Sequence, residues 1–352
     1  MNPGDKIKVL IVDDSAIVRR LLTDALSVEA DIEVVGTASD PFIARDKILA
    51  LHPDVLTLDI DMPRMDGLTF LKRLMRFHPL PVIIVSSMGI ASSRVALEAL
   101  ESGAIDVLAK PSGPQSVGHL HDDLASKIRA ASVARPRNRV GLHPVASEPK
   151  RPTVIASKGF PAAAIIAIGA STGGTEAIQK VLVDIPENSP PILVVQHIPA
   201  FFSRSFADRL NDICRIRVRE AQDGDKPEPG LALIAPGNLH MVLARSAYGY
   251  QVEVKGGPLV CYQRPAVDVL FQSVARAAGP HATGVILTGM GSDGALGLAA
   301  MKAAGARTIA QDEASCVVFG MPKEAIRRGT VDRVLPLLEI PGAMLAEACR
   351  AS

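Results

Sequence analysis

Acidic side chains near the start of the chain are arranged in a way that suits metal and phosphate chemistry. Asp13 and Asp14 directly follow a run of apolar, β-branched residues, and Asp59 directly follows another. Three carboxylates brought to one place repel one another unless a cation joins them. Mg²⁺ fits this purpose, because it prefers oxygen ligands and keeps several waters and a phosphate oxygen in its shell. These acids therefore predict a magnesium-dependent phosphoryl site.

Two further polar positions follow later apolar runs. Ser86 and Ser87 end the fourth run and offer a hydroxyl to a phosphoryl oxygen, and Lys110 ends the fifth run and brings one positive charge. In a doubly wound sheet the carboxyl ends of the strands converge on one rim, where ligands bind. An acid pair after a strand is by itself most simply a solvated turn. The acid pair, single acid, hydroxyl and lysine in this order favour a functional site.

A serine in the second half of the chain lies in a glycine-rich turn. The segment 169–174, Gly-Ala-Ser-Thr-Gly-Gly, stands between an apolar run and a helical pattern, with Ser171 at its centre. Such a turn projects the hydroxyl, while backbone N–H groups at the helix start face a developing oxyanion. Glycine loops between strand and helix also cradle phosphates, and a simple tight turn is a third interpretation. The presence of suitable partner residues distinguishes among these three interpretations.

A nucleophilic serine needs a base, and the base needs an acid that orients it. His197 and Asp293 each follow an apolar run, so both are expected at the strand-end rim that carries Ser171. These positions favour a Ser171–His197–Asp293 triad.

The remaining candidate residues are assigned to other positions. His281 precedes its apolar run and belongs at the opposite end of the sheet, and His240 is expected to be structural or to face the substrate. Asp208, Asp212 and Asp268 lie in helical patterns and are expected to face solvent.

The first half of the chain alternates short apolar runs with helical patterns. Helical spacing of apolar residues marks segments such as 16–26 and 68–76. The runs expected to form strands are residues 9–12, 34–35, 55–58, 82–85 and 107–109. Alternation of this kind predicts parallel strands with crossover helices, and five strands fit a flavodoxin-like doubly wound α/β domain.

A change of composition separates the two halves. Residues 128–160 mix Arg, Lys and Pro with Ala and Ser without apolar periodicity, which indicates a flexible, basic and proline-rich linker between domains at 1–127 and 161–350. Beyond the linker the expected strands are residues 163–168, 192–195 and 284–287, and the expected helices are 177–182, 267–278 and 296–304. This half is predicted to be a second doubly wound α/β domain, with a small antiparallel excursion at 231–254.

Composition limits the classes of function. The formal net charge of +1 argues against nucleic acid as the main partner, and the basic linker lacks aromatic residues that would stack on bases. No apolar run is long enough to span a bilayer, and residues 1–8 lack a signal-peptide layout, so we expect a cytoplasmic protein without direct membrane insertion. The cysteines form no CxxC pair and are expected to be reduced, mostly buried thiols: Cys214, Cys261, Cys316 and Cys349.

Residues 6–127 resemble the receiver domain of two-component response regulators, most strongly in the segment 59–67, Asp-Ile-Asp-Met-Pro-Arg-Met-Asp-Gly. The resemblance implies that Asp59 takes a phosphoryl group from a histidine kinase, with Mg²⁺ as cofactor. The other implied roles are Mg²⁺ ligation by Asp14, Asp59 and the Asp61 carbonyl, a water-mediated contact of Asp13, a switch hydroxyl on Ser86 and a phosphoryl contact of Lys110. Receivers often carry an aromatic residue or histidine where Val107 stands, so the usual aromatic part of the switch is in question.

Residues 161–348 resemble the catalytic domain of the chemotaxis protein-glutamate methylesterase family, CheB. The motifs that carry the resemblance are Ile-Gly-Ala-Ser-Thr-Gly-Gly-Thr-Glu at 168–176, Val-Gln-His-Ile-Pro at 195–199, Ala-Pro-Gly-Asn-Leu-His-Met at 235–241 and Leu-Thr-Gly-Met-Gly-Ser-Asp-Gly-Ala at 287–295. A receiver joined to this domain through a linker is the family's own architecture. The chain order Ser–His–Asp differs from the Ser–Asp–His order of α/β-hydrolases, which argues against that superfamily.

This second resemblance implies roles for four residues and a reaction. Ser171 would be the nucleophile, His197 the base and Asp293 its orienting acid, with the Met290 N–H in the oxyanion hole. The implied reaction is hydrolysis of glutamate γ-methyl esters on chemoreceptors with release of methanol, without a cofactor, together with deamidation of receptor glutamines. The implied partners are methyl-accepting chemotaxis receptors as substrate and the histidine kinase CheA as phosphodonor.

The alternative is a response regulator whose output domain only binds DNA or a nucleotide. Such a domain should show a helix-turn-helix with a basic recognition helix, a G-x-G-x-x-G loop or a G-K-[ST] loop. None of these patterns occurs after residue 160. An inactive scaffold would not need His197 and Asp293 at matching strand ends.

Overall fold

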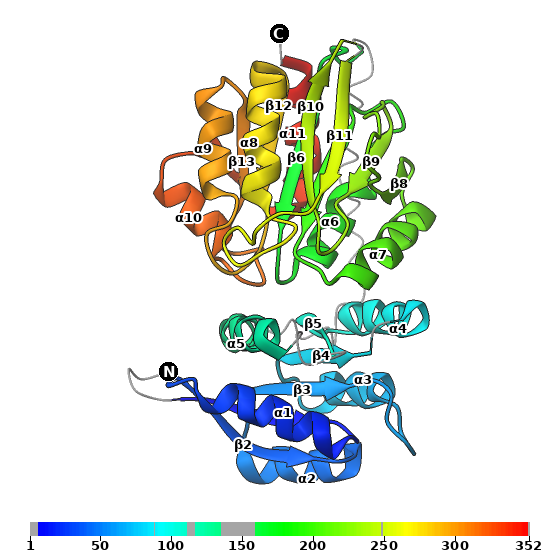
Figure 1. The fold of residues 1–352 in the computed structure, drawn as a ribbon, viewed down its shortest axis with the longest axis vertical. Helices are drawn as coiled ribbons and strands as arrows, with labels where there is room; N and C mark the ends of the chain where they lie inside the picture. Colours follow the sequence, from blue (N-terminus) through cyan, green and yellow to red (C-terminus); the bar gives the residue numbers. More distant parts are fainter. Residues whose placement is uncertain (1–5, 88, 111–116, 135–158, 248, 351–352) are drawn as a thin grey trace. The chain divides into compact units, whose positions relative to one another are not determined.

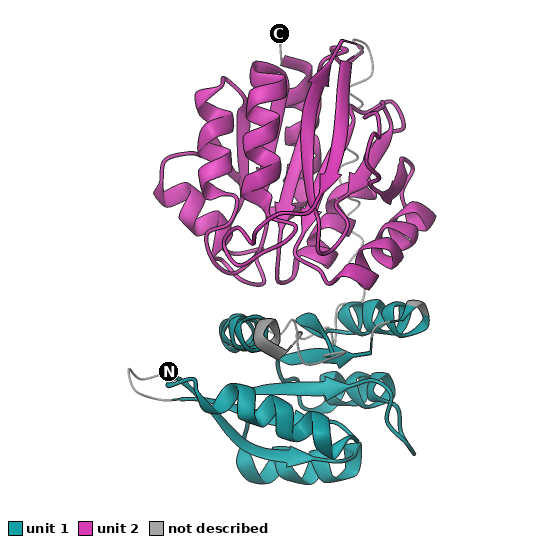
Figure 2. Cartoon of the chain, in the orientation of Figure 1, with its two compact units in different colours: residues 1–143 teal, residues 144–352 magenta. Residues whose placement is uncertain are grey.

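The chain folds into two compact units, Met1–His143 and Pro144–Ser352, which Figure 2 colours separately. The computed structural model describes residues 6–87, 89–110, 117–134, 159–247 and 249–350. Most of the expected linker at 128–160 lies outside these described residues, so the domain boundaries stay predictions. Helix α5 (Val117–Val133) continues past residue 127 into the expected linker.

A five-stranded sheet forms the centre of the first unit, with strand order β2-β1-β3-β4-β5 and parallel pairing throughout (Figure 1). The strands are β1 (Ile7–Val12), β2 (Ile32–Ala38), β3 (Val55–Asp59), β4 (Val82–Ser86) and β5 (Asp106–Ala109). The helices are α1 (Ala16–Ser27), α2 (Pro41–Leu51), α3 (Gly67–Phe77), α4 (Ile90–Glu101) and α5. Strands β3 and β4 are buried along their whole length, which explains their near-continuous apolar sequences. The flavodoxin-like fold is confirmed.

Local sequence fixes the turns at the carboxyl rim of this sheet. Ser15 caps α1 by accepting a hydrogen bond from the N–H of Val18, and Asp66 caps α3 by accepting one from the N–H of Thr69 at 2.8 Å. At Gly67 a Cβ atom would lie 2.0 Å from the carbonyl oxygen of Asp59, so the chain folds back tightly after β3. This turn fixes the backbone around Asp59.

A seven-stranded parallel sheet forms the centre of the second unit, in the order β14-β13-β12-β6-β7-β9-β8. Its strands are β6 (Ile165–Ala170), β7 (Ile192–Gln196), β8 (Arg217–Glu220), β9 (Leu231–Ile234), β12 (Ala282–Ile286), β13 (Arg307–Gln311) and β14 (Arg333–Leu335). The central strands β6, β7 and β12 are fully buried. The catalytic candidate Ser171 directly follows the last residue of β6, and the candidate His197 directly follows the last residue of β7.

Helices cover both faces of the second sheet (Figure 1). They are α6 (Gly174–Leu182), α7 (Ala200–Ile213), α8 (Val267–Ala278), α9 (Ala295–Ala303), α10 (Met321–Arg327), α11 (Ile340–Arg350) and the short 3₁₀ turns η2 (Gly279–His281) and η3 (Leu337–Glu339). Helix α8 packs against α9, and α6 packs against α11 and α7. Among the described residues, no helix combines the length and apolarity that crossing a membrane requires.

The antiparallel excursion is smaller than the sequence suggested. Strands β10 (His240–Ser246) and β11 (Gly249–Lys255) pair antiparallel in a separate two-stranded sheet, and β10 packs against α8. The first part of the expected excursion, β9, instead joins the main sheet as a parallel strand between β7 and β8. All four β9 residues are buried, which places them in the core rather than on a half-exposed hairpin. The expectation for this part was wrong.

Candidate functional sites

The structure brings the expected acids and the lysine of the first unit together. The Lys110 ammonium lies 2.8 Å from a carboxylate oxygen of Asp13 and 2.8 Å from one of Asp59. Both acids are buried, and each is 1% exposed. Burial raises the pKa of Asp59 above its ordinary value, the hydrogen bond from Lys110 opposes this, and the charge of Asp13 adds to it. Two buried acids thus share one cation.

This cluster suits a divalent cation. Each of Asp13, Asp14 and Asp59 offers a carboxylate oxygen, and these three oxygens lie within 4.8 Å of one another. Asp14 is exposed, so the cluster opens to solvent on one side. A single lysine leaves the three carboxylates with surplus negative charge, and an all-oxygen donor set of this kind fits Mg²⁺. The backbone of Asp61 is next to the cluster, because its N–H donates to a carboxylate oxygen of Asp59 at 3.2 Å.

The expected switch hydroxyl is at the end of β4. Ser86 is fully buried, and within the described part of the chain its hydroxyl has no hydrogen-bond partner. Its carbonyl oxygen accepts a hydrogen bond from the N–H of Lys110 at 2.8 Å. The neighbouring Ser87 hydroxyl donates to the Asp61 carboxylate at 3.2 Å. Val107 is buried in β5 at 1% exposure, without an aromatic ring that could rotate.

In the second unit, Ser171 stands in a tight turn between β6 and α6. Its N–H donates to the carbonyl oxygen of Thr288, and its own carbonyl oxygen accepts a hydrogen bond from the N–H of Gly174 at 2.7 Å. Gly173 has a φ of 77°, which favours glycine, and a Cβ atom there would lie 2.5 Å from Val317. The turn therefore needs its glycine. The Ser171 hydroxyl makes no hydrogen bond to any described residue, which leaves it available for chemistry.

His197 and Asp293 form a buried pair. The Nε2 atom of His197 lies 2.8 Å from a carboxylate oxygen of Asp293, and the two residues are 6% and 2% exposed. Asp293 also accepts hydrogen bonds from the N–H groups of Val267 at 2.7 Å and Asp268 at 2.9 Å, at the start of α8. Three donors therefore hold the Asp293 carboxylate in a fixed orientation at the N-terminus of α8. The pair has the geometry of a base held by an orienting acid.

Strand pairing brings His197 close to Ser171 at the carboxyl ends of β6 and β7. Ala170 at the end of β6 is paired with Gln196 at the end of β7, and the N–H of His197 donates to the carbonyl oxygen of Ala170 at 3.1 Å. Ser171 and His197 are therefore the next residues on adjacent parallel strands. This register places both residues at the same rim of the sheet, as we expected from the sequence.

The backbone N–H of Met290 directly follows a residue that packs on Ser171. The preceding residue, Gly289, packs on Ser171 so closely that a Cβ atom on it would lie 2.7 Å from the Cβ of Ser171. Within the described residues, the Met290 N–H donates to no acceptor. An unpaired N–H beside the serine is suited to hold a developing oxyanion.

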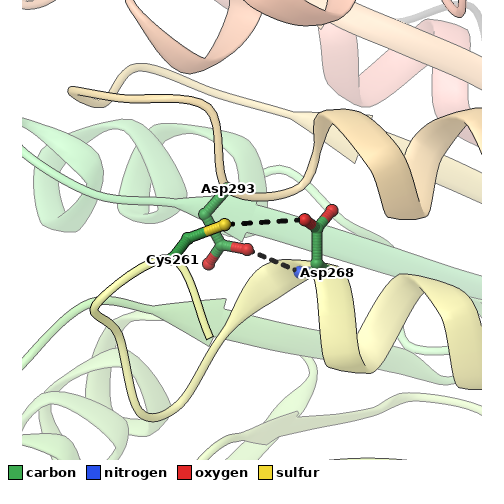
Figure 3. Close-up of side chains that lie close together, drawn as sticks. All are labelled: Cys261, Asp268 and Asp293. Carbon is green, nitrogen blue, oxygen red and sulfur yellow. Dashed lines mark hydrogen bonds between the residues drawn. The ribbon is translucent and has the colours of Figure 1, made fainter. Parts of the chain in front are cut away.

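Asp268 corrects an expectation. It is 2% exposed rather than solvent-facing, and its carboxylate accepts hydrogen bonds from the N–H of Gly297 at 2.6 Å and from the Cys261 thiol at 3.8 Å. Figure 3 shows Cys261, Asp268 and Asp293 side by side. The error arose because Asp268 is in the first turn of α8, whose N-terminus is covered by the loops around it. Asp208 and Asp212 are exposed, as expected. The expectation of mostly buried cysteines was wrong, because Cys261 is exposed and the other three are partly exposed: Cys214, Cys316 and Cys349.

His240 has both ring nitrogens engaged. Its Nε2 lies 2.9 Å from the carbonyl oxygen of Pro258, and its Nδ1 accepts a hydrogen bond from the N–H of Ala266 at 3.3 Å. It is buried, and these bonds tie β10 to the segment before α8. The structural one of its two expected roles is favoured. His281 precedes β12 and is at the other end of the sheet from Ser171.

Sequence reasoning missed two buried residues near the three candidate triad residues. Gln196 donates a hydrogen bond to the carbonyl oxygen of Ser171, and the Thr288 hydroxyl donates to that of Thr172 at 3.0 Å. Both residues end apolar runs, where a polar residue is ordinarily the first of a loop. Their position one residue before His197 and beside the glycine loop was the available signal.

Comparison with known proteins identifies the family. Residues 9–120 match the response regulator receiver domain, and residues 166–344 match the CheB methylesterase family. The chain belongs to the CheB methylesterase family and carries the receiver domain of response regulators. The family resemblances, the two α/β folds and the enzyme class expected from the sequence are thereby confirmed.

Individual relatives agree over nearly the full length. "Protein-glutamate methylesterase/protein-glutamine glutaminase 2" of Syntrophus aciditrophicus is 58% identical over 94% of this chain and 96% of the relative. The protein-glutamate methylesterase/protein-glutamine glutaminase of Escherichia coli K12 is 52% identical over 97% of each chain. The crystal structure of the Thermotoga maritima CheB methylesterase catalytic domain is 38% identical, with a TM-score of 0.51, over 54% of this chain and 99% of that chain.

Proposed function

We propose that this protein hydrolyses glutamate γ-methyl esters on chemoreceptors, releasing methanol, and deamidates receptor glutamines to glutamates. The observation that carries the proposal is the buried hydrogen bond of 2.8 Å between His197 Nε2 and Asp293, one strand away from Ser171. The relatives that are named methylesterase and glutaminase support it over nearly the whole chain.

The hydrogen bond to Asp293 supports different roles for the two nitrogens of His197 in this proposal. Nε2 carries the proton that Asp293 accepts, so Nδ1 is the basic nitrogen that takes the proton of the Ser171 hydroxyl. The serine oxygen attacks the ester carbonyl, and the Met290 N–H donates to the oxyanion that forms. His197 returns the proton to the departing methoxide, which leaves as methanol.

Water completes the cycle. It gives a proton to His197 and attacks the acyl-enzyme, and the proton passes back to Ser171 as the glutamate carboxylate leaves. Deamidation follows the same steps, with ammonia leaving in place of methanol. Neither reaction, as proposed, calls on a cofactor.

The receiver domain is a phosphorylation domain whose chemistry usually depends on Mg²⁺. We infer that Asp59 accepts the phosphoryl group, and that Asp14, Asp59 and the Asp61 carbonyl hold the ion, with Asp13 acting through water. When bound, Mg²⁺ would neutralise charge between these acids and the phosphoryl group. Lys110 and Ser86 are the proposed phosphoryl contacts. The role of Lys110 is supported by its position, because its ammonium already lies beside the carboxylates of Asp13 and Asp59.

The proposed setting follows from the family. The proposed substrate is a methyl-accepting chemotaxis receptor. The proposed phosphodonor is a histidine kinase, and more specifically the kinase CheA. The protein is proposed to act in the cytoplasm, without inserting into the membrane or binding nucleic acid. The proposed domains are a receiver at 1–127, a linker at 128–160 and a catalytic domain at 161–350.

Methanol release from methylated receptor membranes tests the function. The unchanged protein should release methanol, and Ser171→Ala should abolish this while the protein stays folded. His197→Ala should be nearly as severe, since a serine hydroxyl is a weak nucleophile without its base. If folded Ser171→Ala releases methanol at the rate of the unchanged protein, Ser171 is not the nucleophile. If the unchanged protein releases no methanol, the alternative of an output domain that only binds is favoured.

A further inference from the structure

The side chain of Gln196 connects the proposed nucleophile to the proposed base. Gln196 is the last residue of β7 and is 2% exposed. Its Nε2 donates to the carbonyl oxygen of Ser171 at 2.8 Å and to the carbonyl oxygen of His197 at 3.1 Å. One planar amide group therefore binds the backbone of both residues.

The amide is held in this orientation by its surroundings. A Cβ atom on Gly174 would lie 2.0 Å from Gln196 Oε1, so the amide packs directly on the first residue of α6. Its Oε1 is buried and has no hydrogen-bond partner among the described residues. A buried, unpaired acceptor costs stability, and the two donated hydrogen bonds have to offset that cost in the folded protein. The two donated hydrogen bonds are what a glutamine adds.

These bonds act where the strand ladder ends. The N–H of His197 still donates to the carbonyl oxygen of Ala170, but Ser171 and His197 themselves lie beyond the last paired residues of β6 and β7. The Ser171 carbonyl oxygen accepts from Gly174 and from Gln196, one donor on its own turn and one on the neighbouring strand. The Gln196 side chain thus links the backbones of Ser171 and His197 by hydrogen bonds where the strand pairing has ended.

We propose that Gln196 is a positioning residue for the esterase reaction, holding Ser171 and His197 at the separation and orientation that proton transfer requires. The proposal rests on the esterase function proposed above. Gln196 is too deeply buried to touch a substrate, so its loss should act on kcat and leave KM unchanged. Misplacing reacting groups by about 1 Å costs about 10²-fold in rate, and a loss of about 10²-fold in kcat is expected.

The test uses full-length protein and methanol release at several concentrations of methylated receptor membranes, with thermal unfolding measured for every variant. Gln196→Met keeps the length of the side chain and removes both donors. Gln196→Glu keeps its shape and turns a carboxylate oxygen toward two carbonyl oxygens, so its kcat should fall at least as far. Because Gln196→Met buries no charge, it decides the question if Gln196→Glu does not fold.

Thr308 provides a control at the other end of the sheet. It is fully buried near the start of β13, and its hydroxyl donates to the carbonyl oxygen of Thr330 at 2.8 Å and accepts from the N–H of Asp332 at 3.0 Å. The isosteric Thr308→Val should lower the unfolding temperature and keep the kcat of the unchanged protein. A purely structural role for Gln196 predicts the same pattern in both variants.

The outcomes separate the two proposals. If the unchanged protein releases no methanol, or folded Ser171→Ala does, the esterase function itself is wrong. If the esterase is active but folded Gln196 variants keep its kcat, change only KM, or match Thr308→Val, the positioning role is overturned. A selective loss of kcat at Gln196 supports it.

Discussion

Replacing Asp293 by asparagine tests the geometry of the triad, because it keeps the size of the side chain and removes its charge. The carboxylate accepts hydrogen bonds from His197 Nε2 and the Val267 N–H on one oxygen, and from the Asp268 N–H on the other. An amide has a single acceptor oxygen. Whichever way it turns, its NH₂ group faces at least one N–H donor.

The size of the effect follows from the two orientations. In the first, His197 keeps its acceptor but loses the negative charge that stabilises its protonated form. In the second, Nε2 has to become the acceptor, which leaves Nδ1 protonated and unable to take the proton of Ser171. Losing the charge and tautomer control of a triad acid costs about 10⁴-fold in kcat. This corresponds to about 5.4 kcal/mol of transition-state stabilisation. The unpaired N–H should also lower folding stability by about 1–3 kcal/mol.

The assay is methanol release from methylated receptor membranes by full-length protein, with thermal unfolding measured in parallel. Asp332→Asn is the control, because Asp332 accepts hydrogen bonds from the N–H and the hydroxyl of Thr308, both at 2.9 Å, and lies outside the triad. It should lose stability and keep kcat. A folded Asp293→Asn protein whose kcat stays within about tenfold of the unchanged protein would refute the orienting role of Asp293.

Three further outcomes are expected. Asp59→Asn should not be labelled by a phosphorylated histidine kinase, and chelating Mg²⁺ should prevent labelling of the unchanged protein; persistent labelling of the variant places the acceptor elsewhere. Deleting residues 1–157 should raise the basal esterase rate toward that of phosphodonor-treated full-length protein, because a tethered receiver can obstruct the catalytic domain until it is phosphorylated. Equal rates for truncated and unphosphorylated full-length protein contradict such inhibition. Burial and the charges of Asp293 and Asp268 raise the pKa of Cys261 to about 11, so its thiolate is scarce at neutral pH and appears as pH rises toward that value. Iodoacetamide alkylation of Cys261, followed by peptide mass spectrometry, should keep accelerating beyond about pH 8.5, whereas a plateau there indicates an ordinary thiol.

The order of polar residues at strand ends was readable from the sequence. Apolar, β-branched runs predict buried parallel strands, and the carboxyl ends of such strands share one rim. That rule alone places Asp13, Asp59 and Lys110 together, and the structure has the lysine 2.8 Å from both acids. The same rule brought His197 and Asp293 to one rim although they are far apart along the chain.

Only the tertiary structure decided how buried each polar group is and what it contacts. The four apolar residues of β9 are compatible with a hairpin or a parallel strand, and the choice depends on the strands on either side. Asp268 has the helical spacing of a surface residue, yet distant loops bury it beside Asp293. The amide of Gln196 finds its two acceptors only after β6 and β7 pair. Sequence periodicity reports which face of an element is apolar, whereas burial and hydrogen bonding depend on segments that meet only in the folded chain.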